Sequence, residues 1–246
     1  MKKLTSIILL TLSVFLISGC GKVVEESELN FRNGKYYYIN SDKPYSGIIV
    51  SYYENGQLES STNLKDGQED GLYESFYKNG QLKQKSLYKN GKGYGLLECF
   101  YENGQLRYST TYKNGQYDGL VEEYHENGQL KNLWNYKNGK RHGLIKWYYE
   151  NGQLESETNF KDNQPNGLTK IYHENGKLKS LGNYENGKLE GLFQSWDVTG
   201  KLNSFQIYQK GRKDNYSIPK NTRLDFKWNY NLRSKIDKNG NEILYI

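Results

Sequence analysis

The sequence contains no alanine, and it has little proline, cysteine or methionine (3, 2 and 1 of 246 residues). Because alanine is the strongest helix former, its absence argues against a helical protein. Two cysteines cannot build a disulfide framework, which excludes the small disulfide-stapled class. The mean hydropathy of −0.94 excludes a protein built from several membrane-spanning helices.

The abundant residues favour turns and strands. The chain holds 24 tyrosines, 26 glycines and 27 asparagines, and Gly and Asn are turn residues whereas Tyr favours strands. The formal net charge is +6. Residues 20–209, however, hold 23 basic and 24 acidic residues, whereas residues 210–246 hold 9 and 4. The central chain is therefore electrically balanced, and we expect no nucleic-acid partner.

The first twenty residues are typical of a targeting segment. Lys2 and Lys3 precede an apolar run of about 14 residues, which is a secretory signal pattern too short to span a bilayer. The ending Leu16-Ile17-Ser18-Gly19-Cys20 resembles a bacterial lipobox. The alternative is an ordinary signal peptide with a coincidental cysteine.

The lipobox resemblance implies a membrane-anchored lipoprotein of the cell envelope with palmitate on Cys20. Gly21, and not Asp, follows the cysteine, which resembles sorting to the outer membrane if the organism has two membranes. We assign residues 1–19 to the signal peptide, and residues 20–30 to the lipidated cysteine and a polar tether.

A unit of 24 residues repeats through most of the chain. Numbered from its glycine as position 1, the unit runs seven times over residues 47–214. Position 2 is always aliphatic, position 6 aromatic, position 12 Leu, and position 18 Leu, Tyr or Phe. Two glycine-containing turns per unit leave segments of strand length. The sequence therefore predicts an all-β fold, an elongated antiparallel β-hairpin repeat array.

The Asn-Gly turn in each unit can take two forms. A two-residue type I′ turn would place positions 6 and 12 on opposite faces of the sheet. A three-residue loop such as Glu54-Asn55-Gly56, closed by a glycine bulge, places them on one face. We prefer the bulged loop, because positions 2, 6, 12 and 18 can then form a single core face.

The unit also carries a family resemblance. The pattern Gly-Leu-x-x-x-Tyr-Tyr-Glu-Asn-Gly-Gln-Leu followed by Tyr-Lys-Asn-Gly-Lys-x-x-Gly resembles MORN repeats, specifically the bacterial variant group often labelled antitoxin-like. The resemblance implies a MORN-like hairpin array, and the label implies neutralisation of a toxin. For an exported protein, this would be immunity to a periplasmic or incoming toxin.

Both ends of the array are expected to carry capping strands, because an open sheet needs protected edges. Residues 31–46 read as an N-terminal partial repeat, and residues 215–246 as a C-terminal β cap. In the latter, Leu224, Phe226, Trp228, Tyr230 and Leu232 alternate with polar residues, and a hairpin follows around residues 237–240. The alternative for this segment is a partner-specific module.

No set of residues in the sequence has the arrangement of a catalytic or metal site. His125 and His173 occupy the same position two units apart, about 19 Å from each other in a stack of strands. Cys99 has no fixed histidine neighbour, and the turn glutamates recur with the repeat, whereas catalysis needs one asymmetric arrangement. We therefore expect a protein that is not an enzyme, with no cofactor and no metal.

The remaining candidate is a binding surface on the face opposite the expected core. Positions 3, 5 and 7 are apolar and aromatic there, which is typical of protein-recognition surfaces. Packing inside a curled sheet is the equally weighted alternative. We expect a protein partner; the alternative function is a glycan- or host-surface-binding adhesin. The candidate partner-binding residues are Tyr53, Tyr77, Tyr101, His125, Trp147, Tyr149 and His173.

Overall fold

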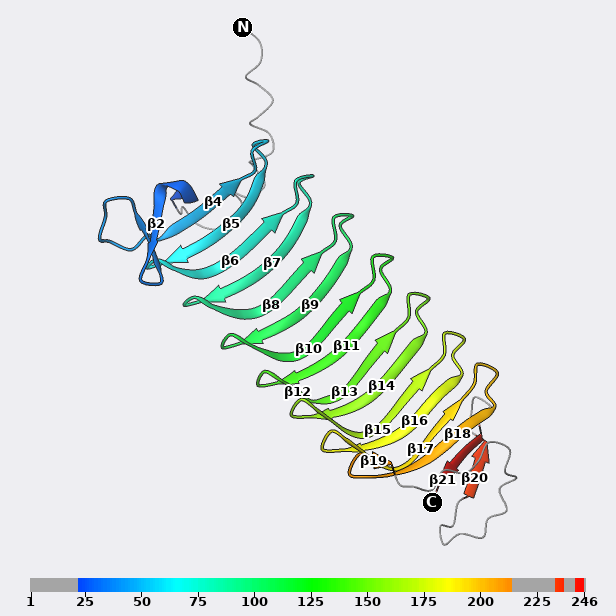
Figure 1. Cartoon of the computed structure of the whole chain (residues 1–246). Helices are drawn as coiled ribbons and strands as arrows, with labels where there is room; N and C mark the ends of the chain where they lie inside the picture. Colours follow the sequence, from blue (N-terminus) through cyan, green and yellow to red (C-terminus); the bar gives the residue numbers. More distant parts are fainter. Residues whose placement is uncertain (1–21, 214–232, 237–241, 246) are drawn as a thin grey trace. The chain divides into compact units, whose positions relative to one another are not determined.

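The computed structural model describes residues 22–213, 233–236 and 242–245 (Figure 1). The described chain is all-β, as predicted, and its one helical turn is the 3-10 segment η2, Glu26–Glu28. Contacts divide the chain into two compact units, residues 1–92 and residues 93–246. We describe each unit by itself.

The first unit contains an edge strand, a separate hairpin and the beginning of the repeat array. Its strands are β1 (Val23–Glu25), β2 (Leu29–Arg32), β3 (Lys35–Tyr38), β4 (Gly47–Tyr52), β5 (Leu58–Lys65), β6 (Gln68–Phe76) and β7 (Leu82–Lys89).

The second unit is an array of successive antiparallel strands (Figure 1). Its strands are β8 (Lys92–Phe100), β9 (Leu106–Lys113), β10 (Gln116–Tyr124), β11 (Leu130–Lys137), β12 (Lys140–Arg141), β13 (Gly143–Tyr148), β14 (Leu154–Lys161), β15 (Gln164–Tyr172), β16 (Leu178–Glu185), β17 (Lys188–Trp196), β18 (Leu202–Gln209), β19 (Arg212–Lys213), β20 (Arg233–Ile236) and β21 (Glu242–Tyr245).

The Asn-Gly loop has the predicted bulged form. In the loop after β8, the amide of Gly104 donates to the carbonyl of Tyr101 at 2.9 Å, and Gly104 has a φ of 85°. This is a type I turn closed by a residue in the left-handed region. Position 6 consequently pairs with position 12, as Phe100 does with Leu106.

A second bulge follows at once, and it overturns the predicted core face. Position 5 pairs with position 14 (Cys99 with Tyr108) instead of position 13, so position 1 pairs with position 18 (Gly95 with Tyr112). Positions 1, 3, 5, 7, 14, 16 and 18 therefore share one face, which we call the inner face. Positions 2, 6 and 12 lie on the other, the outer face. The expectation that position 18 joins positions 2, 6 and 12 is wrong.

In the middle repeats burial follows the inner face, whereas in the last repeats Leu178 and Trp196 of the outer face are also buried. Val121 and Ile145, both at position 3, are fully buried, whereas their neighbours Leu120 and Leu144 at position 2 are 41% and 37% exposed. Thr110, at position 16, is also buried and pairs with Val121. In the middle repeats the core is thus a seam along positions 3 and 16, which contains Val121, Ile145, Thr110 and Thr158.

The glycine at position 1 marks the bend that makes this seam possible. Between Tyr117 and Val121 the pairing with β9 slips by two residues, and Gly119 between them has a φ of 114°. A Cβ at Gly119 would lie 2.8 Å from Oγ1 of Thr111. Bulges bend the strand and increase its twist, and beyond this one Val121 pairs with Thr110 on the inner face.

The N-terminal residues differ from the expected tether. Instead of running free, Val23–Glu25 forms β1, which pairs in parallel with the edge strand β4 (Val24 with Ile49). Val24 is only 5% exposed and packs in a core with Leu29, Tyr45 and Leu64. The chain protects the open edge of β4 by this pairing, because apolar residues at Val23 and Val24 fit a strand.

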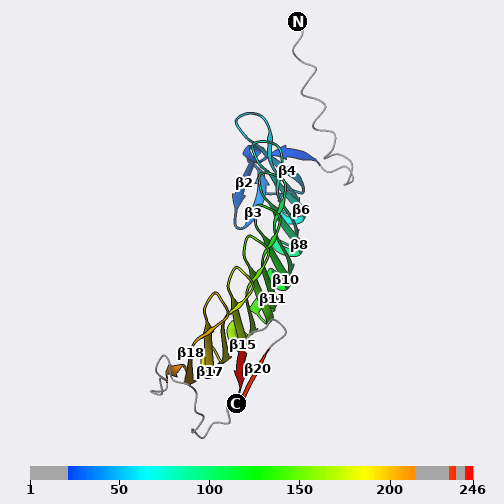
Figure 2. The ribbon, with the colours of Figure 1, turned by 90° about the vertical axis from the view of Figure 1, so that its right-hand side faces the viewer.

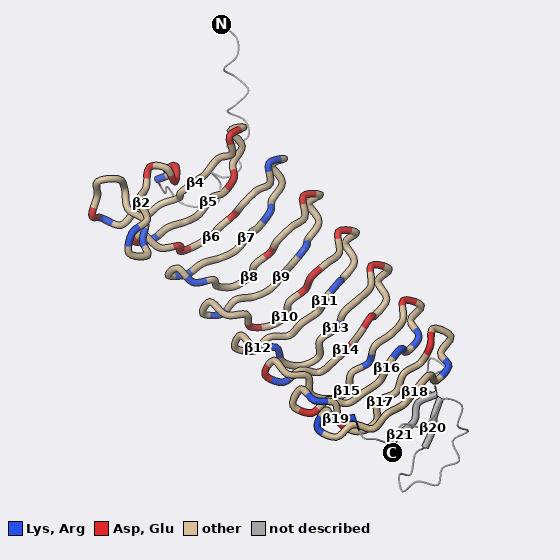
Figure 3. The backbone as a smooth tube through the Cα atoms, in the orientation of Figure 1, with Lys and Arg blue, Asp and Glu red and all other residues tan. Residues whose placement is uncertain are grey.

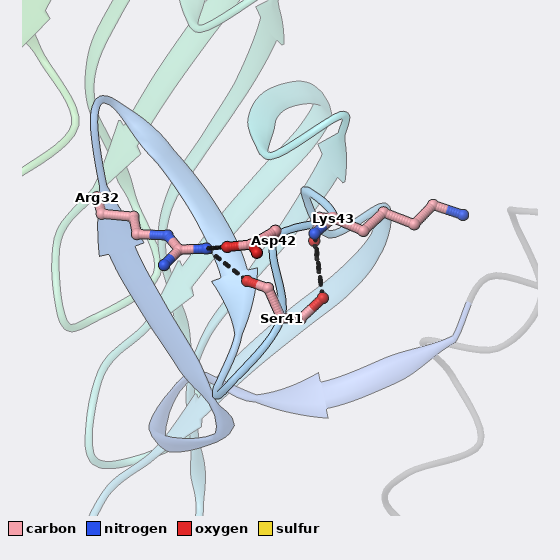
Figure 4. Close-up of polar contacts among 4 residues, drawn as sticks. All are labelled: Arg32, Ser41, Asp42 and Lys43. Carbon is pink, nitrogen blue, oxygen red and sulfur yellow. Dashed lines mark hydrogen bonds and ion pairs between the residues drawn. The ribbon is translucent and has the colours of Figure 1, made fainter.

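Residues 31–46, expected as an N-terminal partial repeat, overlap the β2–β3 hairpin, which forms its own two-stranded sheet beside β4 (Figures 1 and 2). Its following loop is held by Arg32, whose guanidinium donates to Oδ1 of Asp42 at 2.8 Å and to the carbonyl of Ser41 (Figure 4). This clamp fixes the chain that leads from the hairpin into the array.

At the other end, β20 pairs antiparallel with β21. The predicted alternating strand over residues 224–232 lies outside the described residues. Leu178, Leu181 and Trp196 form a second buried cluster in the last repeats of the second unit.

Candidate binding surface

The aromatic row at position 7 links neighbouring repeats. The hydroxyl of Tyr101 donates to the carbonyl of Tyr124, and that of Tyr149 to the carbonyl of Tyr172 at 2.8 Å. Nε2 of His125 lies 3.2 Å from the carbonyl of Tyr148, and donates when it carries the proton. Each ring therefore reaches position 6 of the following repeat and staples the two together.

The other predicted residues of this surface are also engaged. Tyr53 donates to the carbonyl of Phe76, and Nε2 of His173 lies 3.1 Å from the carbonyl of Trp196. Tyr77 is half-buried, and the ammonium of Lys83 lies 5.7 Å from its ring. Trp147 lies at position 5 on the inner face, between Asn132 and Ser156 of the neighbouring strands. Several of these rings already contact the neighbouring repeat. Binding of a partner by these residues stays a prediction.

A larger aromatic group lies on the inner face of the second unit. The ring centroids of Tyr112 and Tyr117 are 4.8 Å apart, and those of Tyr117 and Tyr136 are 5.3 Å apart. Arg141 donates from Nε to the hydroxyl of Tyr136 at 3.2 Å. We call the following set the aromatic strip: Tyr108, Tyr112, Tyr117, Trp134, Tyr136 and Arg141.

The remaining members of the aromatic strip extend it inward. The guanidinium of Arg141 lies 5.4 Å from the ring of Trp134, whose buried Nε1 has no hydrogen-bond partner. Burial raises the pKa of Tyr108, and its hydrogen bond with Tyr117 adds to this. The strip is therefore held together by ring contacts and one cation, and one buried indole donor is left unsatisfied.

Sequence reasoning assigned Tyr112 and Tyr136 to the core and missed the aromatic strip. The signal that could have found it is the second turn of each unit. A two-residue turn at Asn114-Gly115 pairs position 18 with position 23, which brings Tyr112 against Tyr117. Position 23 is Tyr or Arg in only two units, Tyr117 and Arg141, so the strip exists only there.

Two recurring rows of charge lie at opposite edges of the second unit, although both edges also carry residues of the other sign. Glutamates at position 8 lie in the loops of one edge, and lysines at position 19 lie in the turns of the other (Figure 3). The acidic edge carries Glu102, Glu126, Glu150 and Glu174, and the basic edge carries Lys113, Lys137 and Lys161. Arg141 follows one of these basic turns, so the aromatic strip approaches the positive edge.

The described residues include side chains of the types that bind metals or act as nucleophiles. Among them no three His, Cys, Asp or Glu side chains come together as a metal site would require. Cys99 is buried and burial raises the pKa of its thiol, which disfavours the reactive thiolate. Residues 22–213 and the two short C-terminal strands also contain no helix long and apolar enough to cross a membrane.

Taken together, the successive antiparallel hairpins define a β-hairpin repeat protein. The MORN repeat variant family matches this chain at residues 45–66, 69–90, 94–114, 117–138, 141–162 and 165–186, more than half of its length. The chain therefore belongs to the MORN repeat variant family. The seventh predicted unit, which contains β17 and β18, lies beyond these matches. No curated protein matches the sequence.

Proposed function

We propose that the protein is a non-enzymatic binding protein that holds a protein partner on the aromatic strip of its second unit. The observation that carries this proposal is the strip itself: tyrosine rings, one tryptophan and one arginine packed on a single face. Tyr, Trp and Arg are the residues that dominate binding energy at protein interfaces. The basic turns beside Arg141 favour a partner that presents carboxylates there.

The row at position 7 has a supporting part in this proposal. Because Tyr101, His125 and Tyr149 hold successive repeats in register, they keep the strip rigid before the partner arrives. A rigid surface loses less conformational entropy on binding. Trp147, at position 5, lies on the inner face of β13 beside the strand that carries Trp134 and Tyr136, and it extends the surface offered to the partner.

The proposed setting is the cell envelope, with the chain anchored through lipid on Cys20. The signal-like segment and the lipobox-like Leu16-Ile17-Ser18-Gly19-Cys20 support this. Residues 1–21 lie outside the described part of the chain. In this setting an antitoxin-like role becomes immunity to a toxin that is periplasmic or arrives from outside.

Site-specific photo-crosslinking tests the partner. A photoreactive phenylalanine replaces Tyr117 in the strip or, as a matched control, Tyr94, which is 53% exposed and not part of the strip. In detergent-solubilised envelopes we expect a discrete protein adduct from position 117 only, and we expect Arg141→Ala to abolish it. Equal adducts at both positions would refute the assignment of the strip.

A glycan-binding role is the second candidate, because tyrosine faces next to an arginine also stack on sugar rings. Recovery of peptidoglycan or polysaccharide alone, lost on Tyr117→Ala and kept on Tyr94→Ala, would establish it in place of the protein partner.

A further inference from the structure

The first unit contains a cavity that the repeat alone would not form. It has a volume of about 420 Å³ and lies between the β2–β3 hairpin and two turns of the array. The hairpin contributes Phe31, Gly34 and Tyr36; the turns contribute Gly67, Gln68, Glu69, Asn90, Gly91 and Lys92. The cavity therefore exists because a non-repeating element packs against the repeats.

Backbone contacts fix the walls of this cavity. The amide of Tyr36 donates to the carbonyl of Gly67 at 2.9 Å, and the amide of Gly91 donates to the carbonyl of Glu69 at 2.8 Å. Gly67 has a φ of 79°, and a Cβ there would lie 2.9 Å from the carbonyl oxygen of Tyr36. The rings of Phe31 and Tyr36 are 4.9 Å apart, and the Arg32 clamp holds the loop that follows (Figure 4). The hairpin wall of the cavity is therefore hydrogen-bonded directly to the turn at Gly67.

Glu69 gives the cavity its chemical character. Its carboxyl is half-buried and makes no ion pair with any described residue. Burial raises its pKa, and no neighbouring cation offsets this. The charge of Glu69 in turn helps to raise the pKa of Tyr36, which bonds to Glu26, and of Tyr88. Lys92 is exposed at the rim.

No other unit has this carboxylate. The position of Glu69 in the unit, position 23, is occupied by Gly93, Tyr117, Arg141, Pro165, Leu189 and Lys213 in the other six. The acidic residue thus occurs only in the unit that the hairpin covers. Phe31, which also lines this cavity, is 65% exposed.

We propose that this cavity binds a small organic cation, a primary or quaternary ammonium group, between Glu69 and the rings of Phe31 and Tyr36. A half-buried carboxylate without a counterion gains most from a cationic partner. Aromatic faces attract ammonium groups by cation–π interaction, and they shield the methyl groups from water. This site is separate from the aromatic strip and does not depend on the partner proposed for it.

A pair of ligands of equal shape tests the role of charge. Choline and its neutral isostere 3,3-dimethylbutan-1-ol are titrated into the full chain in detergent, with glycine-selective amide labelling to follow Gly34, Gly67 and Gly91. We expect choline to shift these three signals saturably and to bind at least about tenfold more tightly than the neutral alcohol.

Two substitutions and one control locate the site. Glu69→Gln keeps the size of the side chain and removes its charge, so choline should bind about tenfold more weakly while the neutral alcohol is unaffected. Phe31→Ala should weaken both ligands. Glu59→Gln removes the same charge from an exposed position outside the cavity and should change neither.

The pH dependence gives an independent readout. Choline affinity should fall as the pH drops through the raised pKa of Glu69, because the carboxyl becomes neutral, and Glu69→Gln should remove this dependence. Equal binding of choline and the neutral alcohol, or unchanged choline binding by Glu69→Gln, would overturn the proposal. Binding of glucose without binding of choline would replace it with a saccharide site.

Discussion

At the scale of single residues, the same residue type serves different purposes at different positions of the unit. A tyrosine at position 7 donates its hydroxyl across the stack, as Tyr101 does to Tyr124. A tyrosine at position 18 or 23 packs its ring against its neighbours, as Tyr112 and Tyr117 do. Sequence alone could identify the rows, because they recur at a fixed spacing. The sequence could not show which tyrosines hydrogen-bond to the next repeat and which pack against other rings. That difference depends on the carbonyl or ring that each side chain contacts.

The raised pKa of Tyr45 predicts how the stability of the protein changes at alkaline pH. Burial raises its pKa to about 12, and the charges of Tyr38 and Glu28 add to this. In the unfolded chain a tyrosine ionises near pH 10. The unfolded state therefore loses the proton first, so stability is present below about pH 10 and is lost as the pH rises from there towards 12.

Urea unfolding midpoints between about pH 9 and about pH 11 measure this loss. In Tyr45→Phe we expect a lower midpoint at neutral pH, because the phenol no longer donates to the carbonyl of Lys22, and a shallower fall above about pH 10. Tyr94→Phe, at an exposed tyrosine, should keep the original slope. An unchanged slope in Tyr45→Phe would contradict the assignment.

At the scale of the hairpin, two bulges decide which side chains are buried. The bulge that closes the Asn-Gly loop was predictable, because a glycine at a fixed offset from an aromatic residue marks it. In the second bulge, positions 12 and 13 of one strand lie opposite position 6 of the other. No residue type in the sequence marks this bulge, since position 13 is Glu, Lys, Arg or Asn. A single unmarked residue therefore moved position 18 to the other face, and with it the core.

Adjacent residues on β13 test this reversal. Ile145 is fully buried and Leu144 is 37% exposed. We expect Ile145→Ala to lower the free energy of unfolding by roughly 2–5 kcal/mol, since it removes a buried side chain and leaves a cavity. Leu144→Ala should cost less than about 1 kcal/mol. If the leucine row were the core, denaturant unfolding would show a larger loss of stability for Leu144→Ala than for Ile145→Ala.

At the scale of the whole chain, the charge is unevenly distributed along the sequence. The array is almost neutral, and the excess positive charge belongs to the first residues and to residues 210–246. The family and the all-β fold could be predicted because the 24-residue period is nearly unbroken. The small cavity at Glu69 could not, because it depends on how the β2–β3 hairpin packs against the turns.

The proposed anchor gives a prediction at this scale. Cys20→Ser removes the only residue that the lipobox-like segment offers for acylation, so the protein should move from the membrane pellet to the soluble fraction after cell disruption. Several acyl chains on one residue anchor a protein firmly, and a protein without them lacks this membrane affinity. Cys99→Ser, at the buried cysteine, should stay in the pellet. Retention of Cys20→Ser in the pellet would refute the anchor.

The contacts that position 7 makes with the next repeat also affect how repeats can be gained or lost from such a chain. Each ring contacts the carbonyl 23 residues further along, so every junction inside the second unit is made in the same way. Recombination that removes or duplicates one whole unit joins surfaces that already match, whereas a shift of any other size breaks the staples. The structure therefore makes unit number a variable on which unequal crossing-over can act, while the residues that give each unit its own surface are carried along intact.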